Sequence, residues 1–245
     1  MSTVLSLPIL TLCELADPGL PHVESYSPFC LKIHRALKLA QLPYERRLAD
    51  RPDAHKRLNP LGQVPVLLVA DEAVFDSTAI LHRIEQLAPG RLQPELTARQ
   101  RADAWLWEEF ADTTLNGFLV AARWADDRNW PLTREAYFSG MPIPVKALIP
   151  RLIRRRVVGG LHARDVWRAG GEVCWQRFLT VLDDLEAHIA GQRYWLGDVR
   201  TVADLAVFGQ LHSLRTPLTP WQGAELAKRR ELTAWLDRID AETVG

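Results

Sequence analysis

Every stretch of this 245-residue chain that has the pattern of a β-strand ends by Phe75, and after Pro94 only helical patterns remain. Short apolar or alternating runs predict four strands, at residues 9–15, 44–49, 64–69 and 72–75. Apolar residues at helical spacing predict three helices among them, at 28–41, at 52–58 and from Asp76 or Ser77 to just before Pro89. We therefore expect an α/β domain of order βαβαββα over residues 1–90, followed by an all-α domain over residues 91–245.

Charge and cysteine content restrict the functional classes. Thirty basic and thirty acidic residues give a net charge of zero, which argues against nucleic acid as a partner. The three cysteines, Cys13, Cys30 and Cys174, are few, odd in number and far apart, as expected in a reducing compartment such as the cytoplasm. We expect no metal site, because no histidine has zinc-ligand spacing to a cysteine. We also expect neither a signal peptide nor a membrane span.

The tetrapeptide Ser27-Pro28-Phe29-Cys30 opens the first predicted helix. The Ser27 hydroxyl and the helix N-terminus can both donate to a sulfur anion and lower the pKa of a bound thiol. The alternative is that Ser27 is only the N-cap of the helix. We expect the Cys30 side chain to pack beneath the turn. The alternative is a reactive Cys30, which would form mixed disulfides with a small thiol. The turn thus predicts a site that holds a thiol.

Several motifs together resemble the glutathione transferase superfamily over nearly the whole chain. They are the βαβαββα order, the Ser-x-x-Cys turn, the segment 59–65, Asp76-Ser77 and a predicted capping box from Thr201 to Asp204. The turn is similar to that of serine-type classes such as tau, and the segment 59–65 is similar to zeta and theta sequences. The long loop before Ser27, with residues 27–32, also resembles the metaxin-like and failed-axon-connections-like branch.

The resemblance implies a thioredoxin-like first domain, a helical second domain and a cytoplasmic homodimer acting in detoxification. It also implies glutathione as cosubstrate and Ser27 as the catalytic residue, with Cys30 as the alternative. In this family the Val64-Pro65 peptide is cis, so that the Val64 backbone can pair with the cysteinyl part of glutathione. Gln63 would help to bind the γ-glutamyl end, although it can equally be an exposed loop amide.

Asp76-Ser77 lies at a predicted strand-to-helix junction, where free N–H groups and the helix dipole favour a carboxylate. Ser77 would then bind the γ-glutamyl carboxylate and Asp76 the ligand amine, unless the pair is simply a helix cap. Four aromatic residues are candidates for the walls of a pocket for a hydrophobic electrophile, or else for core packing: Tyr26, Phe29, Trp105 and Trp124. For the basic run 151–156, a solvated helix face is favoured over a phosphate or membrane site.

Three functions follow from these residues. The leading one is an enzyme that activates the glutathione thiol at Ser27 and uses it for conjugation, reduction or isomerisation. A second is a non-catalytic transferase-like protein in assembly or signalling, suggested by the metaxin-like loop and the unusual segment 141–156. A third is a glutathione-linked thiol reductase that depends on Cys30. The sequence does not identify the electrophile, since pocket walls and cores use the same residue types.

Overall fold

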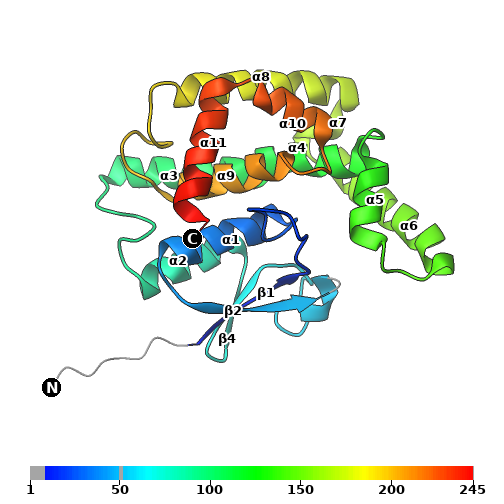
Figure 1. The fold of residues 1–245 in the computed structure, drawn as a ribbon, viewed down its shortest axis with the longest axis horizontal. Helices are drawn as coiled ribbons and strands as arrows, with labels where there is room; N and C mark the ends of the chain where they lie inside the picture. The colour runs from blue at the N-terminus through cyan, green and yellow to red at the C-terminus, as the bar shows by residue number, and fades with distance from the viewer. Residues whose placement is uncertain (1–8, 50–51, 245) are drawn as a thin grey trace.

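The computed structural model describes residues 9–49 and 52–244, and it contains a four-stranded mixed sheet with a thick helical layer above it (Figure 1). The strand order is β2-β1-β3-β4, with β2 parallel to β1 and with β3 and β4 each antiparallel to its neighbour. The strands are β1 (Leu10–Leu15), β2 (Tyr44–Ala49), β3 (Val66–Val69) and β4 (Glu72–Phe75). Helices α1 (Pro28–Leu39) and α2 (Ser77–Leu87) complete this part. The predicted fold class is confirmed.

The sequence-based boundaries differ from the structure by two or more residues at three places. The first helix ends at Leu39, two residues earlier than expected, and Gln41 has a φ of 57°. The helix expected at 52–58 is a short 3-10 helix, η1 (Pro52–His55). The third strand begins at Val66, because Pro65 has no N–H to donate to a ladder.

The rest of the chain is helical, as predicted. Helix α3 (Ala98–Phe110) continues through the π-helical turn η2 (Ala111–Leu115), α4 (Asn116–Val120) and a second π-helical turn, η3 (Ala121–Ala125). The following helices are α5 (Trp130–Phe138), α6 (Ile143–His162), α7 (Asp165–Arg168), α8 (Gly171–Ile189), α9 (Val202–Leu214), α10 (Pro220–Ala227) and α11 (Arg230–Thr243). Helices α5 and α6 extend from one side of the body (Figure 1). Within residues 9–49 and 52–244, no helix is long and apolar enough to cross a membrane.

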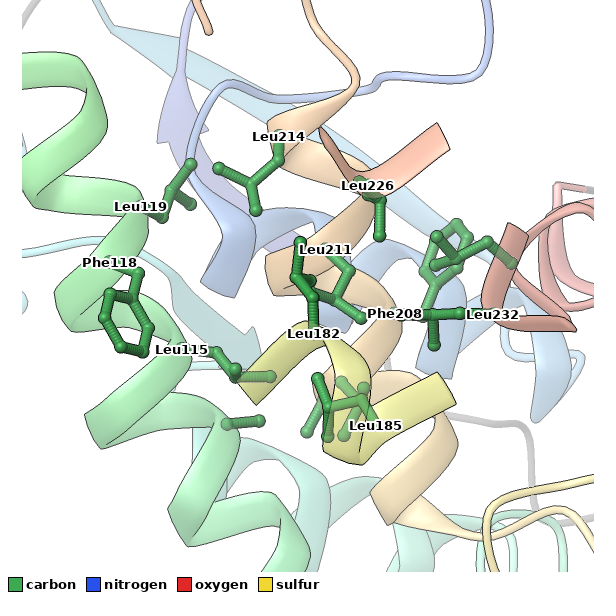
Figure 2. Packing of buried hydrophobic residues seen from close by; sticks show 14 of the residues in the cluster. Leu115, Phe118, Leu119, Leu182, Leu185, Phe208, Leu211, Leu214, Leu226 and Leu232 are labelled. Carbon is green, nitrogen blue, oxygen red and sulfur yellow. The ribbon is translucent and has the colours of Figure 1, made fainter. Parts of the chain in front are cut away.

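Helix α9 joins the two apolar cores. Its first turn, with Val202 and Leu205, packs into the cluster between the sheet, α1 and α2. Its later turns, with Phe208 and Leu211, face the cluster built by the other helices (Figure 2). All residues of α9 are buried. At Gly209 an added Cβ would lie 2.9 Å from the Pro28 carbonyl oxygen, so glycine allows α9 to pack directly on the first turn of α1.

A buried capping box holds the start of α9, as the sequence predicts. The Asp204 carboxylate accepts hydrogen bonds from Thr201 N (2.9 Å), Trp195 N (2.8 Å) and Trp235 Nε1 (3.2 Å). Burial raises the pKa of Asp204 to about 6, while the backbone donors act in the opposite direction. This carboxylate therefore ties α9 to α11 and to the loop before α9 as well as capping the helix.

Helix α1 has three buried basic side chains, and each one reaches a different part of the fold. Lys32 Nζ lies 2.7 Å from Glu108 on α3, and His34 Nε2 lies 2.9 Å from Glu14 on β1. Arg35 Nη1 lies 2.8 Å from Asp240 on α11. A hydrogen bond therefore attaches α1 to the sheet, and ion pairs attach it to two helices of the second domain.

Candidate functional site

Ser27 is the N-cap of α1. Its Oγ accepts a hydrogen bond from Cys30 N (3.3 Å), its carbonyl accepts from Leu31 N (2.9 Å), and its own N–H donates to Ser25 Oγ (3.2 Å). The side chain is half-buried. A hydroxyl that accepts through a lone pair keeps its own O–H as a donor. The capping role is thus compatible with donation from Ser27 to a bound sulfur.

Cys30 lies beneath the turn and is fully buried. Burial raises the pKa of this thiol to about 12, and the charge of Glu14 adds to the rise, while hydrogen bonds with Ser27 and Ser25 oppose it. A thiol that stays protonated at neutral pH is a poor nucleophile. The geometry therefore gives no support to Cys30 as the reacting group.

The Val64–Pro65 peptide is cis, in the loop between η1 and β3. Val64 is partly exposed and Gln63 is exposed. The loop is fixed by Asn59, whose Nδ2 donates to the Gln63 carbonyl (3.0 Å) and whose Oδ1 accepts from Leu61 N (3.0 Å). Asn59, a buried residue of the recognised motif, therefore positions the segment that precedes β3.

Asp76 and Ser77 begin α2, and Asp76 acts as its cap. The Asp76 Oδ1 accepts from Thr78 N (3.0 Å) and Ala79 N (3.1 Å), while its backbone has a φ of 76°. Positive φ is uncommon for a non-glycine residue and is concentrated at functional sites. Ser77 is buried, and its hydroxyl donates to Asp112 Oδ2 across 3.2 Å.

A buried charge cluster behind Ser77 was not predicted from the sequence. It consists of Lys32 on α1, Glu108 on α3 and Asp112 in η2. Lys32 Nζ lies 2.7 Å from Glu108 Oε1 and 2.5 Å from Asp112 Oδ2, and the Lys32 and Glu108 side chains are each only 1% exposed. Burial raises the pKa of Asp112, Lys32 lowers it and Glu108 raises it. The available signal was a lysine at core spacing, three residues after Phe29 and four before Ala36.

A cavity of about 970 Å³ lies beside Tyr26, next to the Ser27 turn. Its walls come from the end of β1 and the segment after it, from Tyr26, from η1, and from α5 with the turn after it. They include Leu15, Asp17, Ala54, Tyr137, Phe138 and Met141. The Tyr26 and Tyr137 rings are 5.7 Å apart. Arg123 is buried and donates from Nη1 to the Tyr26 carbonyl and from Nη2 to the Ser213 carbonyl (3.1 Å), which fixes Tyr26 against the helical domain.

The other aromatic candidates lie in different positions. Trp124 packs behind the cavity wall, with its ring 5.6 Å from that of Tyr137. The Phe29 ring lies 5.7 Å from Lys32 Nζ. Trp105 stacks on His82 at 4.0 Å and lines a separate hollow on α3. Tyr26 therefore lines the cavity directly, Trp124 supports it, and the structure does not bring Trp105 to it.

A sheet of order β2-β1-β3-β4 with a serine-capped α1, a cis-proline loop and a helical domain defines the class of proteins in which a thioredoxin-like domain is joined to a helical one. Residues 26–87 match the Glutathione S-transferase, N-terminal domain, and residues 146–238 match the Glutathione S-transferase, C-terminal domain. The chain belongs to the glutathione transferase superfamily.

Known relatives include both transferases and metaxins. The chain is 26% identical over 191 residues to the Metaxin-2 homolog of Caenorhabditis elegans, covering 76% of this chain and 80% of that one. It is 25% identical over 174 residues to Glutathione S-transferase 3 of Schizosaccharomyces pombe, covering 69% of this chain and 63% of that one. A glutathione transferase family member from Pseudomonas fluorescens, crystallised with two glutathione molecules bound, has the same fold. Its TM-score is 0.64 at 17% identity, with 97% of this chain and 91% of that one covered.

Proposed function

We propose that the protein binds glutathione, stabilises its thiolate through the Ser27 hydroxyl, and conjugates it to a hydrophobic electrophile held beside Tyr26. The observation that carries this proposal is the adjacency of a serine-capped helix N-terminus and the cavity of about 970 Å³ that Tyr26 lines. Bound glutathione in a relative of the same fold adds support. Conjugation remains the leading function, ahead of the Cys30-dependent reduction, because Cys30 is buried with a raised pKa.

The chemistry needs a sulfur anion. The glutathione thiol loses its proton to solvent, and Ser27 Oγ–H together with the α1 N-terminus stabilises the thiolate. Each pKa unit by which these donors lower the thiol corresponds to about 1.4 kcal/mol. The thiolate then attacks an electrophilic carbon of the substrate, the C–S bond forms, and the leaving group departs with its electron pair.

We place the rest of glutathione along the cis-proline loop and the start of α2. The Val64 backbone would pair with the cysteinyl part, and Gln63 would reach the γ-glutamyl end. The Ser77 hydroxyl would bind the γ-glutamyl carboxylate by turning away from Asp112, 3.2 Å away. Lys32 balances one of the two carboxylates behind it, so the net negative charge that remains would attract the ligand amine, together with Asp76.

Glutathione titrated by calorimetry, and turnover of 1-chloro-2,4-dinitrobenzene, test this function. Ser27→Ala should reduce kcat/KM about 100-fold, because removing one donor to a developing anion has an effect of that order. Ser27→Thr should restore both cap and donor, whereas Ser27→Asp should keep the cap but not the activity. Cys30→Ala should retain turnover. Absence of saturable glutathione binding would contradict the proposal.

The second candidate is a non-catalytic role in assembly or signalling. Similarity to the Metaxin-2 homolog favours it, as do the hydrogen bonds that already engage Ser27 and Ser77 within the protein. Under this alternative neither glutathione binding nor turnover would be measured. The homodimer and the cytoplasmic location stay predictions, and light scattering on the purified protein tests the first of them.

A further inference from the structure

Helix α6 (Ile143–His162) concentrates positive charge on one element of a chain whose net charge is zero. It has 20 residues and no acidic side chain. Besides His162 in its last turn, its basic residues are Lys146, Arg151, Arg154, Arg155 and Arg156. The helix extends with α5 from one side of the body (Figure 1). The exposed part of such an element presents a cationic surface to solvent.

Two of these cations are neutralised within the protein. Arg154 Nη2 lies 2.6 Å from Asp127, and its Nε donates to the Trp124 carbonyl (2.8 Å). Lys146 Nζ lies 3.1 Å from Glu135 on α5. These contacts fix the inner face of α6 against η3 and α5.

The other three arginines lie on the outward face. Arg151, Arg155 and Arg156 are exposed, and none of them forms an ion pair with another residue in the described part of the chain. The guanidinium group cannot lose its charge at neutral pH, so this face carries three uncompensated positive charges.

Apolar side chains lie between these arginines. Val145 is 42% exposed, Leu148 58% and Leu152 51%. At 3.6 residues per turn, the three fall within an arc of about 60°. Arg151 and Arg155 flank this arc on one side and Arg156 on the other. These six residues form what we call the α6 outer face.

We propose that the α6 outer face binds the surface of a bilayer that contains anionic lipids. A helix face that only meets water would not need three large apolar side chains, and their exposure counts against the solvated-face interpretation of the basic run. A nucleic acid would pair with the arginines but leave the leucines in water. At a bilayer surface the leucines enter the boundary between headgroups and acyl chains, and the arginines pair with lipid phosphates.

Sedimentation with vesicles tests the charge requirement. Phosphatidylcholine vesicles with and without 30% phosphatidylserine are compared in about 0.1 M salt, where the Debye length is about 10 Å. We expect binding to the anionic vesicles and its loss in about 1 M salt. The triple variant R151Q/R155Q/R156Q should bind about 100-fold more weakly, since each basic residue near an anionic surface contributes about fivefold.

A matched control removes the same charge elsewhere. The variant R57Q/R101Q/R230Q changes three exposed arginines outside α6, and it should keep at least half of the wild-type partitioning. Equal loss in both triple variants would overturn the proposal, because it would reflect net charge alone. Conjugation of 1-chloro-2,4-dinitrobenzene should not change in either variant, so failure here and failure of the proposed function are distinguishable.

Fluorescence tests whether the apolar arc enters the lipid. All three native cysteines are buried, so a thiol-reactive environment-sensitive dye will label Leu148→Cys selectively in the folded protein. Its emission should shift to the blue on anionic vesicles. The control is Leu106→Cys on α3, which is 68% exposed and should not shift. No shift at Leu148→Cys would overturn the proposal. Tighter binding to a 20-nucleotide RNA than to vesicles would also overturn it. So would a protein that binds no vesicles and forms a dimer that L148S/L152S dissociates.

Discussion

Replacing Lys32 with Met should destabilise the protein strongly, because Met keeps most of the side-chain volume and removes only the charge. Lys32 and Glu108 are each 1% exposed, and Lys32 Nζ lies 2.7 Å from Glu108 and 2.5 Å from Asp112. Without the lysine, two carboxylates remain in the interior with no counter-charge. Breaking a buried ion pair in this way costs about 3–5 kcal/mol, a large part of the 5–15 kcal/mol that is typical of a folded domain.

The loss of stability caused by Lys32→Met should depend on pH. Burial and Glu108 raise the pKa of Asp112 in the folded protein, while Lys32 lowers it. A carboxyl group with a raised folded pKa contributes most stability below its unfolded pKa, and this contribution is lost as the pH rises through the folded value. Lys32→Met removes the positive charge that lowers the pKa of Asp112, so this pKa rises further in the folded protein. The stabilisation by the protonated carboxyl group then persists to higher pH. The variant should therefore lose less stability at pH 5 than at pH 7, by up to about 1.4 kcal/mol per pH unit for each proton taken up.

Urea unfolding, monitored by the fluorescence of the nine tryptophans, measures the free energy of unfolding of the wild type and of Lys32→Met at pH 5 and at pH 7. Glu108→Gln is the matched variant, and K32M/E108Q should be less destabilised than the sum of the two single changes. An unchanged m value would show that the comparison concerns stability and not compactness. A loss below about 1 kcal/mol at pH 7, or the same loss at pH 5, would refute the reasoning that the Lys32 charge stabilises two buried carboxylates.

Three further experiments have defined outcomes. Asp204→Ala should lower the free energy of unfolding by about 2–4 kcal/mol, because three buried N–H donors lose their acceptor, and a thermal melt equal to wild type would contradict this. Cys30 should not react with Ellman's reagent in the folded protein at pH 8 but should react in urea, and rapid labelling of the native protein at this residue would revive the reductase function. Gly209→Ala should cost about 1–3 kcal/mol and weaken glutathione binding, because its Cβ would lie 2.9 Å from the Pro28 carbonyl; retained stability and affinity would show that α1 shifts freely.

The fold was predictable where local patterns determine it. Periodicity located all four strands, and the capping pattern at Thr201 located the start of α9. What failed was the extent of the elements near residues 52–65, where proline removes hydrogen-bond donors and tertiary contacts decide between 3-10 and α geometry. The π-helical turns η2 and η3 also leave no pattern in the sequence.

The site was predictable only in part, for a different physical reason. The Ser27 turn and the Val64–Pro65 loop are contiguous motifs, so the sequence alone can locate them. The buried partners Lys32 and Glu108 are 76 positions apart, and pairing at that distance depends on how the domains pack. The sequence leaves Trp105 between a pocket wall and core packing, because an aromatic residue on a helix does not reveal which face it occupies. The structure stacks Trp105 on His82 and packs it against the core beside the sheet.

The buried basic residues of α1 decide whether the first domain can fold without the rest of the chain. Residues 1–90 contain the whole sheet with α1 and α2, yet the counter-charges of Lys32 and Arg35 include Glu108 and Asp240, which come from far beyond residue 90. An isolated first domain would keep Glu24 beside Arg35, but it would have to expose α1 or bury Lys32 without a counter-charge. The boundary near residue 90 is therefore a division in sequence only, and cutting the connection there in the folded protein should leave both fragments associated.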